Sequence, residues 1–172
     1  MAQQNYFTNW TQAVTDAIAG QTGLRLAYEQ NTVTLLATDN INSTYLLFKN
    51  VPFNARIKRL DIENDAIGTG TSFHIGLYNS ATGAVKNASC LASALNLSTA
   101  HTKTQNTTAA NSALDGLAAL THDNSLQPLY LLAGDSLSAS GAQGNYDIVM
   151  TCNQNLSGGG KVTARMELMP AG

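Results

Sequence analysis

Charge is the scarcest property of this sequence. Only 12% of its 172 residues are Asp, Glu, Lys or Arg, about half of the ~25% that is usual in globular proteins. The formal net charge is −2, and the densest basic run, Arg56, Lys58 and Arg59, is diluted at once by Asp61 and Glu63. Binding to duplex nucleic acid requires a basic face, so we expect no direct contact with nucleic acid.

Cysteine is also scarce, and long apolar runs are missing. The opening residues, MAQQNYFTNW, lack the basic and apolar regions of a secretory signal, so we expect synthesis and folding in a reducing cytoplasm. The two cysteines, Cys90 and Cys152, are then expected to be free rather than bridged. No apolar run approaches the ~20 residues of a membrane-spanning helix, so we expect no membrane partner.

Residues that would carry catalysis are not arranged for it. His74, His101 and His122 have no metal-ligand spacing among themselves. The glycine runs 68–71 and 158–160 match neither phosphate-binding nor dinucleotide-binding loops, and no nucleophile elbow or Cys/His pair is present. We therefore expect a protein that is not an enzyme and uses no cofactor.

Three carboxylates come closest to a metal site. Asp61, Glu63 and Asp65 alternate along a predicted strand, which places them on one face, and they could collect Ca²⁺. The spacing lacks the glycine and the distal glutamate of a calcium loop, and basic residues lie nearby to neutralise it. We favour a solvated charged face and expect no bound metal.

Alternation of apolar and polar residues with a period of two dominates what is present. It predicts strands at 32–38, 45–51, 55–64, 72–79, 145–153 and 161–169. Because a glycine-rich break separates each of the last two pairs, we expect hairpins over 55–79 and 145–169. In the first hairpin, Phe73, Ile75 and Leu77 should be buried, and His74 should be a surface or edge residue.

Helical patterns are confined to two regions, residues 1–24 and residues 114–133. Residues 1–24 carry an amphipathic stripe of Trp10, Ala13, Val14, Ala17 and Ile18. So short a helix is marginal alone, so it must dock either on the chain's own core or on a neighbouring subunit, and the residues leave both options open.

The middle of the chain is less regular. Leu91, Leu95 and Leu97 fit either a helical turn or a short strand, and 101–111 is expected to be a surface loop. Short helices are predicted near 114–120 and over 126–133, the second ending at Gly134, and 135–144 is expected to be another loop.

The whole pattern predicts a mainly β protein. We expect an antiparallel β-sandwich, jelly-roll-like, over residues 31–172, with one or two short helices in a central insertion and an N-terminal helical arm over 1–30.

Three stretches in this order resemble a known group of proteins. They are VPFNARIKRLDIENDAIGTGTSFHIGLYN at 51–79, LASALNLSTA at 91–100, and QPLYLLAG at 127–134 followed by GNYDIVMT and KVTARMEL. Together they resemble the auxiliary decoration, or cement, proteins of tailed-bacteriophage heads, over about residues 45–169. The resemblance implies a β-sandwich that oligomerises, commonly as a trimer, on the capsid surface of the virion, with the major capsid protein as partner.

Two functions follow as hypotheses. In the first, the protein binds across capsomer junctions and stabilises the head, using Trp10, Val14 and Ile18 of the arm and the face formed by Arg59, Asp61 and Glu63. In the alternative, it is a receptor-binding or carbohydrate-binding module of a fibre or tail, supported by the long loops at 98–113 and 135–144. Sugar sites usually hold exposed aromatic residues in a cleft, and these loops contain none.

Overall fold

Strands make up nearly all of the regular structure in the part of the chain that the structure describes. The computed structural model describes residues 27–69, 71–106, 127–136 and 144–169. The predicted arm helix, with Trp10, Val14 and Ile18, and the predicted helix near 114–120 lie outside these residues. The described elements are β1 (Ala27–Leu35), β2 (Thr44–Val51), β3 (Arg56–Asn64), β4 (Ser72–Asn79), β5 (Val85–Asn96), β6 (His101–Asn106), α3 (Leu129–Leu132), β7 (Tyr146–Cys152) and β8 (Gly160–Met169).

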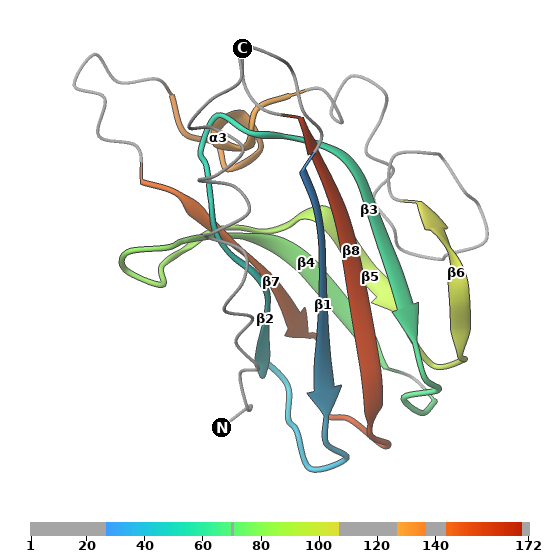
Figure 1. The fold of residues 1–172 in the computed structure, drawn as a ribbon. Coiled ribbons are helices and arrows are strands. Elements are labelled where there is room, and N and C mark those ends of the chain that lie inside the picture. The colour runs from blue at the N-terminus through green and yellow to red at the C-terminus, as the bar shows by residue number, and fades with distance from the viewer. Residues whose placement is uncertain (1–26, 70, 107–126, 137–143, 170–172) are drawn as a thin grey trace.

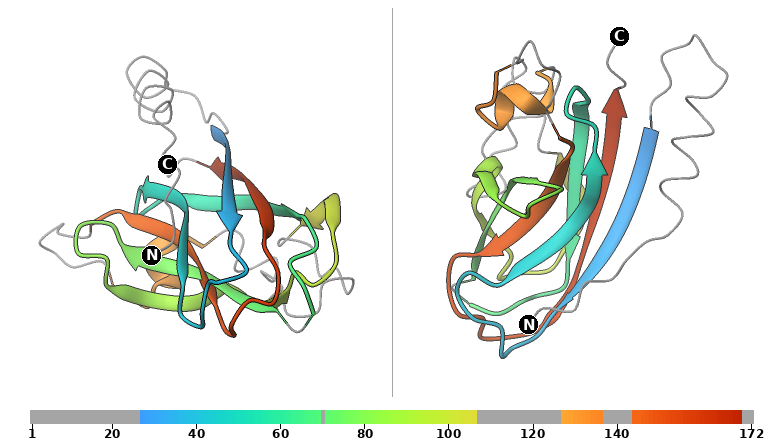
Figure 2. Two further views of the ribbon diagram at one scale, coloured as in Figure 1. Left: turned by 90° about the horizontal axis from the view of Figure 1, so that it is seen from below. Right: turned by 90° about the vertical axis from the view of Figure 1, so that its left-hand side faces the viewer.

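The strands form two antiparallel sheets of four strands each (Figure 1). One sheet has the order β1-β8-β3-β6 and the other has the order β2-β7-β4-β5. Seen from the side, the two sheets form separate layers (Figure 2). The prediction of a mainly β protein with two antiparallel sheets is confirmed.

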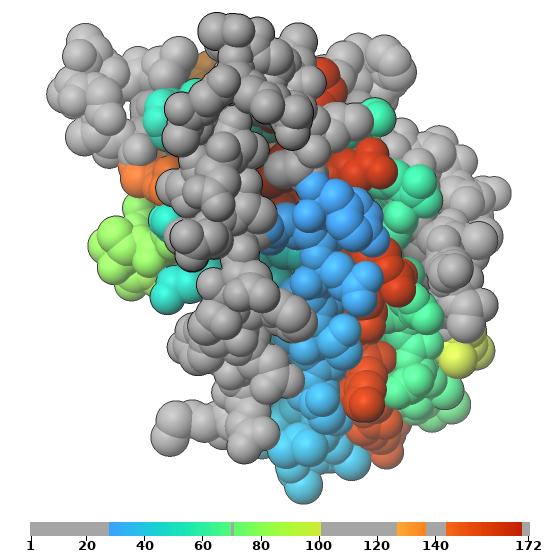
Figure 3. Space-filling view, viewed as in Figure 1, coloured from blue at the N-terminus to red at the C-terminus, as the bar shows by residue number. Residues whose placement is uncertain are grey.

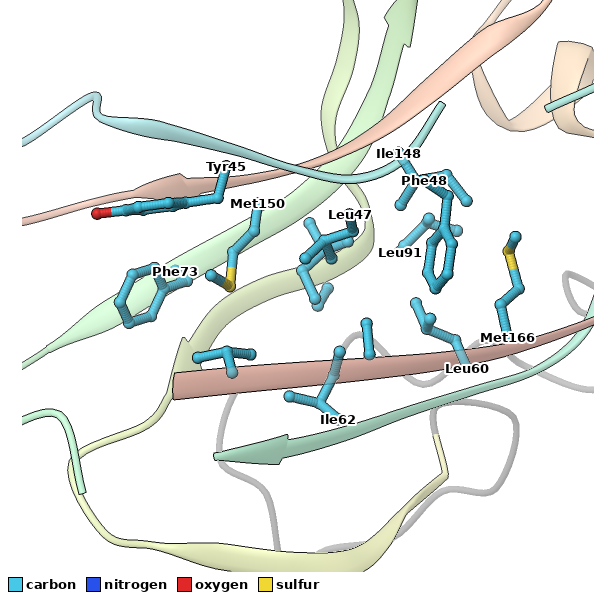
Figure 4. Close-up of a cluster of buried hydrophobic side chains, with 14 of the residues drawn as sticks. Tyr45, Leu47, Phe48, Leu60, Ile62, Phe73, Leu91, Ile148, Met150 and Met166 are labelled. Carbon is cyan, nitrogen blue, oxygen red and sulfur yellow. The ribbon is translucent and has the colours of Figure 1, made fainter. Parts of the chain in front are cut away.

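The buried apolar residues that the structure describes form one hydrophobic core between the sheets. The alternation of β8 buries Val162, Ala164, Met166 and Leu168, and Figure 4 shows Leu60, Ile62 and Met166 pointing toward side chains of the opposite sheet. Burial removes roughly 1.5–3 kcal/mol of unfavourable hydration for each large apolar side chain. The predicted burial of the three alternating apolar residues of β4 is confirmed, because each is 0% exposed: Phe73, Ile75 and Leu77.

Both predicted hairpins are wrong. β3 pairs with β6 and β8, whereas β4 pairs with β5 and β7 in the other sheet. In the same way, β7 pairs with β2 and β4, while β8 pairs with β1 and β3. Alternation shows which side of a strand is buried and does not show which strand lies beside it. The connections cross from sheet to sheet instead, and Ile67 in the first of them is itself fully buried.

The middle of the chain contains two strands. β5 resolves the choice left open for Leu91 and Leu95 in favour of a strand, which is strongly bulged against β4. The loop predicted over 101–111 is wrong for its first part, because His101–Asn106 forms β6 along the free side of β3. This edge strand was missed because its sequence, HTKTQN, has no apolar alternation. Residues 107–111 lie outside the described part of the chain.

Two boundaries also differ from the prediction. β1 begins at Ala27 rather than Thr32. The sequence pattern did not indicate this earlier start, because the polar residues Glu29 and Asn31 occupy the inward side of the strand and interrupt the alternation. α3 is shorter than the predicted helix over 126–133, but it ends as expected before Gly134, whose φ of 78° suits glycine. The Leu129 and Tyr130 N–H groups donate to the carbonyl oxygens of Ala55 and Phe53, which fixes α3 at one end of the sheets.

Candidate interaction surface

The outer side of the β1-β8-β3 sheet carries the three charged residues that the sequence predicted as contacts, Arg59, Asp61 and Glu63. The strand register places them in rows, such as Tyr28, Glu167 and Arg59 side by side. Figure 3 looks onto this side, where β1 (blue), β8 (red) and β3 (green) are adjacent. We call it the polar face, and its residues are Tyr28, Gln30, Thr32, Arg59, Asp61, Glu63, Lys161, Thr163, Arg165 and Glu167.

Both arginines of the polar face are paired with a carboxylate of the same face. Arg165 Nη2 lies 2.7 Å from Glu63 Oε2, without the alignment of a hydrogen bond, and its Nε donates to Gln30 Oε1 at 2.9 Å. The Arg165 side chain therefore connects β8 to both of its neighbours. Arg59 Nε lies 2.7 Å from Asp61 Oδ2, and the hydrogen bond to Asp61 raises the pKa of Arg59.

The three predicted contact residues on this face differ in accessibility. The side chains of Arg59 and Glu63 are 42% and 31% exposed, whereas that of Asp61 is 12% exposed. A partner would therefore meet Arg59 and the 60% exposed Tyr28 before it could reach Asp61. The contact role of all three stays a prediction, as does that of Trp10, Val14 and Ile18, which lie outside the described residues.

The structure does not assemble a metal site from the carboxylates it describes. Asp61 and Glu63 face arginines, and Asp65 Oδ2 accepts the Lys161 N–H at 2.8 Å. Among the described residues, no group of three or more His, Cys, Asp or Glu side chains could hold a metal ion. His74 is half-buried on β4, where its Nδ1 accepts the Ala94 N–H at 3.1 Å. In the same part of the chain, no helix is long and apolar enough to cross a membrane.

Both thiols are free, as predicted, and neither is activated. Burial raises the pKa of the Cys90 thiol to about 12 and that of the Cys152 thiol to about 11. A thiol must lose its proton to act as a nucleophile. Neither cysteine therefore has the properties of a catalytic residue at neutral pH.

A second surface feature lies on the outer side of the β2-β7-β4 sheet. It is a shallow hollow of about 260 Å³, which we call the outer hollow, lined by Thr44, Leu46, Lys49, Tyr78, Ser80, Gly83, Asp147 and Val149. The sequence did not indicate this hollow, because its aromatic residue, Tyr78, lies on a strand rather than in one of the long loops. The available signal was the outward position of this tyrosine in the alternation of β4.

Comparisons with known proteins identify a likeness of fold. No protein-family model matches the sequence, and no curated protein sequence matches it. A solved structure described as the cyanophage Pam1 capsid asymmetric unit contains a similar chain, with a TM-score of 0.53 and 14% sequence identity. The alignment covers 87% of this chain and 88% of that chain. The two proteins therefore share a fold over nearly their whole lengths.

Proposed function

We propose that this chain is a non-enzymatic structural protein of a bacteriophage virion that decorates and stabilises the capsid surface. The observation that carries the proposal is the shared fold with a chain from a phage capsid, over 87% of one chain and 88% of the other. The proposed partner is the major capsid protein, and the proposed state is a symmetric oligomer, with a trimer favoured.

The strand order supports a capsid role. Two four-stranded sheets with the orders β1-β8-β3-β6 and β2-β7-β4-β5 support the proposed jelly-roll architecture, in which eight strands form two Greek keys. This architecture is common in viral capsid proteins. The similarity to the phage capsid chain lies in the fold rather than in the sequence, since the identity is only 14%.

The surface chemistry also suits an assembly. The arginines of the polar face are paired with carboxylates of the same chain, so adjacent copies would meet without a strong excess of one charge. Low mutual repulsion favours close packing of identical subunits. The arm formed by residues 1–24 would then extend over a capsid subunit or a sister protomer, with Trp10 as its anchor.

Quantitative mass spectrometry of purified virions tests the proposal. We expect the chain in a fixed ratio to the major capsid protein, and an oligomeric mass for the purified chain in solution. Capsids stripped of the chain should release DNA at a lower temperature than those to which it is added back. A monomer that is absent from virions would overturn the proposal.

Two variants test the proposed contacts separately. Deletion of residues 1–24 should abolish capsid binding or oligomer formation, and Arg59→Ala should lower occupancy by removing an exposed contact. Lys86→Ala is the control, because Lys86 lies on β5 in the other sheet and pairs with Asp135. If the deleted chain still decorates heads at full occupancy, the role of the arm is wrong.

A further inference from the structure

The orientation of Tyr78 gives the outer hollow its shape. The register pairs Tyr78 with Asp147, yet its hydroxyl lies 2.8 Å from Thr151 Oγ1, and Thr151 pairs with His74, four residues back along β4. A tyrosine that projected straight into solvent could not reach so far along the strand. The side chain must therefore lie along the sheet surface and turn one side of its ring outward.

The backbone of β5 limits the hollow on one side. At Gly76, a Cβ atom would lie 2.1 Å from the carbonyl oxygen of Asn87 and 2.3 Å from the carbonyl carbon of Ala88. β5 thus covers the outer side of β4 at this point. The surface that stays open lies toward β7 and β2, where Val149 and Leu46 add apolar area beside the Tyr78 ring.

A fixed hydrogen-bond acceptor stands at the edge of this apolar area. Asp147 Oδ1 accepts the Asn50 N–H at 2.8 Å and the Ser80 hydroxyl at 2.6 Å, which holds the carboxylate in one orientation. Its Oδ2 atom accepts no hydrogen bond from the described part of the chain. Thr44, which carries a hydroxyl group, also lines the hollow.

These features together select the class of ligand. A volume of about 260 Å³ lies just under the roughly 300–1,000 Å³ of typical small-molecule sites, so the ligand is small. Lys49 and Asp147 contribute opposite charges, so the hollow favours a neutral molecule. An aromatic ring beside a fixed carboxylate suits a molecule with one apolar side and several hydroxyl groups.

We propose that the outer hollow binds one neutral pyranose ring of a glycan, with the C–H side of the sugar on Tyr78 and two of its hydroxyl groups donating to Asp147. This site is separate from the polar face, which lies on the other sheet. It concerns the isolated chain and does not depend on capsid decoration.

An NMR titration of the full chain tests the proposal. The probes are the methyl glycosides of glucose, galactose, mannose and N-acetylglucosamine, each added up to about 50 mM. At least one should give saturable shifts of the Tyr78, Asp147 and Val149 amide signals, with a Kd of about 1 mM.

Three variants separate the sugar site from general effects on the fold. Tyr78→Ala should weaken binding at least about tenfold, since it removes the stacking surface. Asp147→Asn can still accept the Asn50 and Ser80 hydrogen bonds but removes the charged acceptor, and should also weaken binding several-fold. Tyr28→Ala is the matched control, because Tyr28 is an exposed tyrosine on the other sheet, and it should bind as the wild type does.

Several results would overturn the inference. They are no saturable shift with any of the four sugars, shifts that map to the β1-β8-β3 sheet, or equal binding by the wild type and both hollow variants. Occupancy on virions is measured separately from sugar binding. A negative sugar titration therefore does not contradict the capsid proposal, and absence from virions does not contradict the sugar site.

Discussion

Glu29 places a carboxyl group on the inner side of its strand, β1. The register pairs it with Met166, which pairs in turn with Leu60, and both of these partners are fully buried. Burial raises the pKa of Glu29 from 4.5 to about 8. The folded protein therefore holds Glu29 in its protonated form at neutral pH, whereas the unfolded chain would ionise it.

This raised pKa makes stability depend on pH in a defined direction. Because the folded pKa exceeds the unfolded one, the contribution of Glu29 is complete below about pH 4.5 and is lost as the pH rises through about 8. Glu29 is only partly buried, so we expect a loss of about 1–2 kcal/mol rather than the full linkage value.

Glu29→Gln should remove this dependence, because the amide stays neutral at every pH. Urea unfolding from about pH 5 to about pH 8.5 measures the free energy of unfolding in both proteins. The wild type should lose stability across this range and the variant should lose less. Glu167→Gln, the same change on the polar face, is the control and should leave the wild-type slope in place. Parallel curves for Glu29→Gln and the wild type would contradict the expectation.

At the scale of the element, the pairing of β3 with β8 rather than with β4 can be tested through one ion pair. Glu63 lies on β3 and Arg165 on β8, with 2.7 Å between Oε2 and Nη2. A double-mutant cycle of Glu63→Ala and Arg165→Ala should give a coupling energy of about 0.5–1 kcal/mol, as is usual for a partly exposed pair.

The control cycle joins Glu63→Ala with Lys86→Ala. Lys86 lies on β5 in the other sheet and pairs with Asp135, so its coupling to Glu63 should be zero within error. A Glu63–Arg165 coupling no larger than this control would argue against the observed register of β3 and β8.

Alternation in the sequence predicted the faces of the strands but not their neighbours. It placed Phe73, Ile75 and Leu77 in the core correctly and placed Arg59, Asp61 and Glu63 on one face, where the register puts them. Which strands pair depends on where each strand lies in space after the chain has passed from one sheet to the other. That choice is made by long-range packing, which leaves no local pattern in the sequence.

The candidate surfaces were predictable to different degrees. The sequence predicted that β3 has a charged side, but it did not predict the burial that leaves the Asp61 side chain only 12% exposed. The outer hollow could not be foreseen, because it needs β2, β4 and β7 side by side, and this order follows only from the three-dimensional arrangement. The polar strand β6 was not predicted either, because an edge strand does not need an apolar side and so shows no alternation in the sequence.

At the scale of the whole molecule, both sheets contribute to one core. The buried set includes Met166 of β8 and Met150 of β7, each 0% exposed and each in a different sheet. Neither sheet can keep its apolar side covered if the other opens. The two sheets should therefore unfold together as one cooperative unit.

Matched core substitutions test this cooperativity. Met166→Ala and Met150→Ala should each cost about 2–5 kcal/mol, because each leaves a cavity in the shared core. In native-state hydrogen exchange, the slowest amides of both sheets should then speed up by the same factor, at least about 30-fold for a loss of about 2 kcal/mol. If Met166→Ala accelerated exchange only in β1, β3 and β8, while β2, β4 and β7 kept their wild-type rates, the two sheets would be separate folding units. The same reasoning predicts that each variant shows one unfolding transition, with the same midpoint in near-ultraviolet and far-ultraviolet circular dichroism, since side-chain packing and strands are lost in a single step.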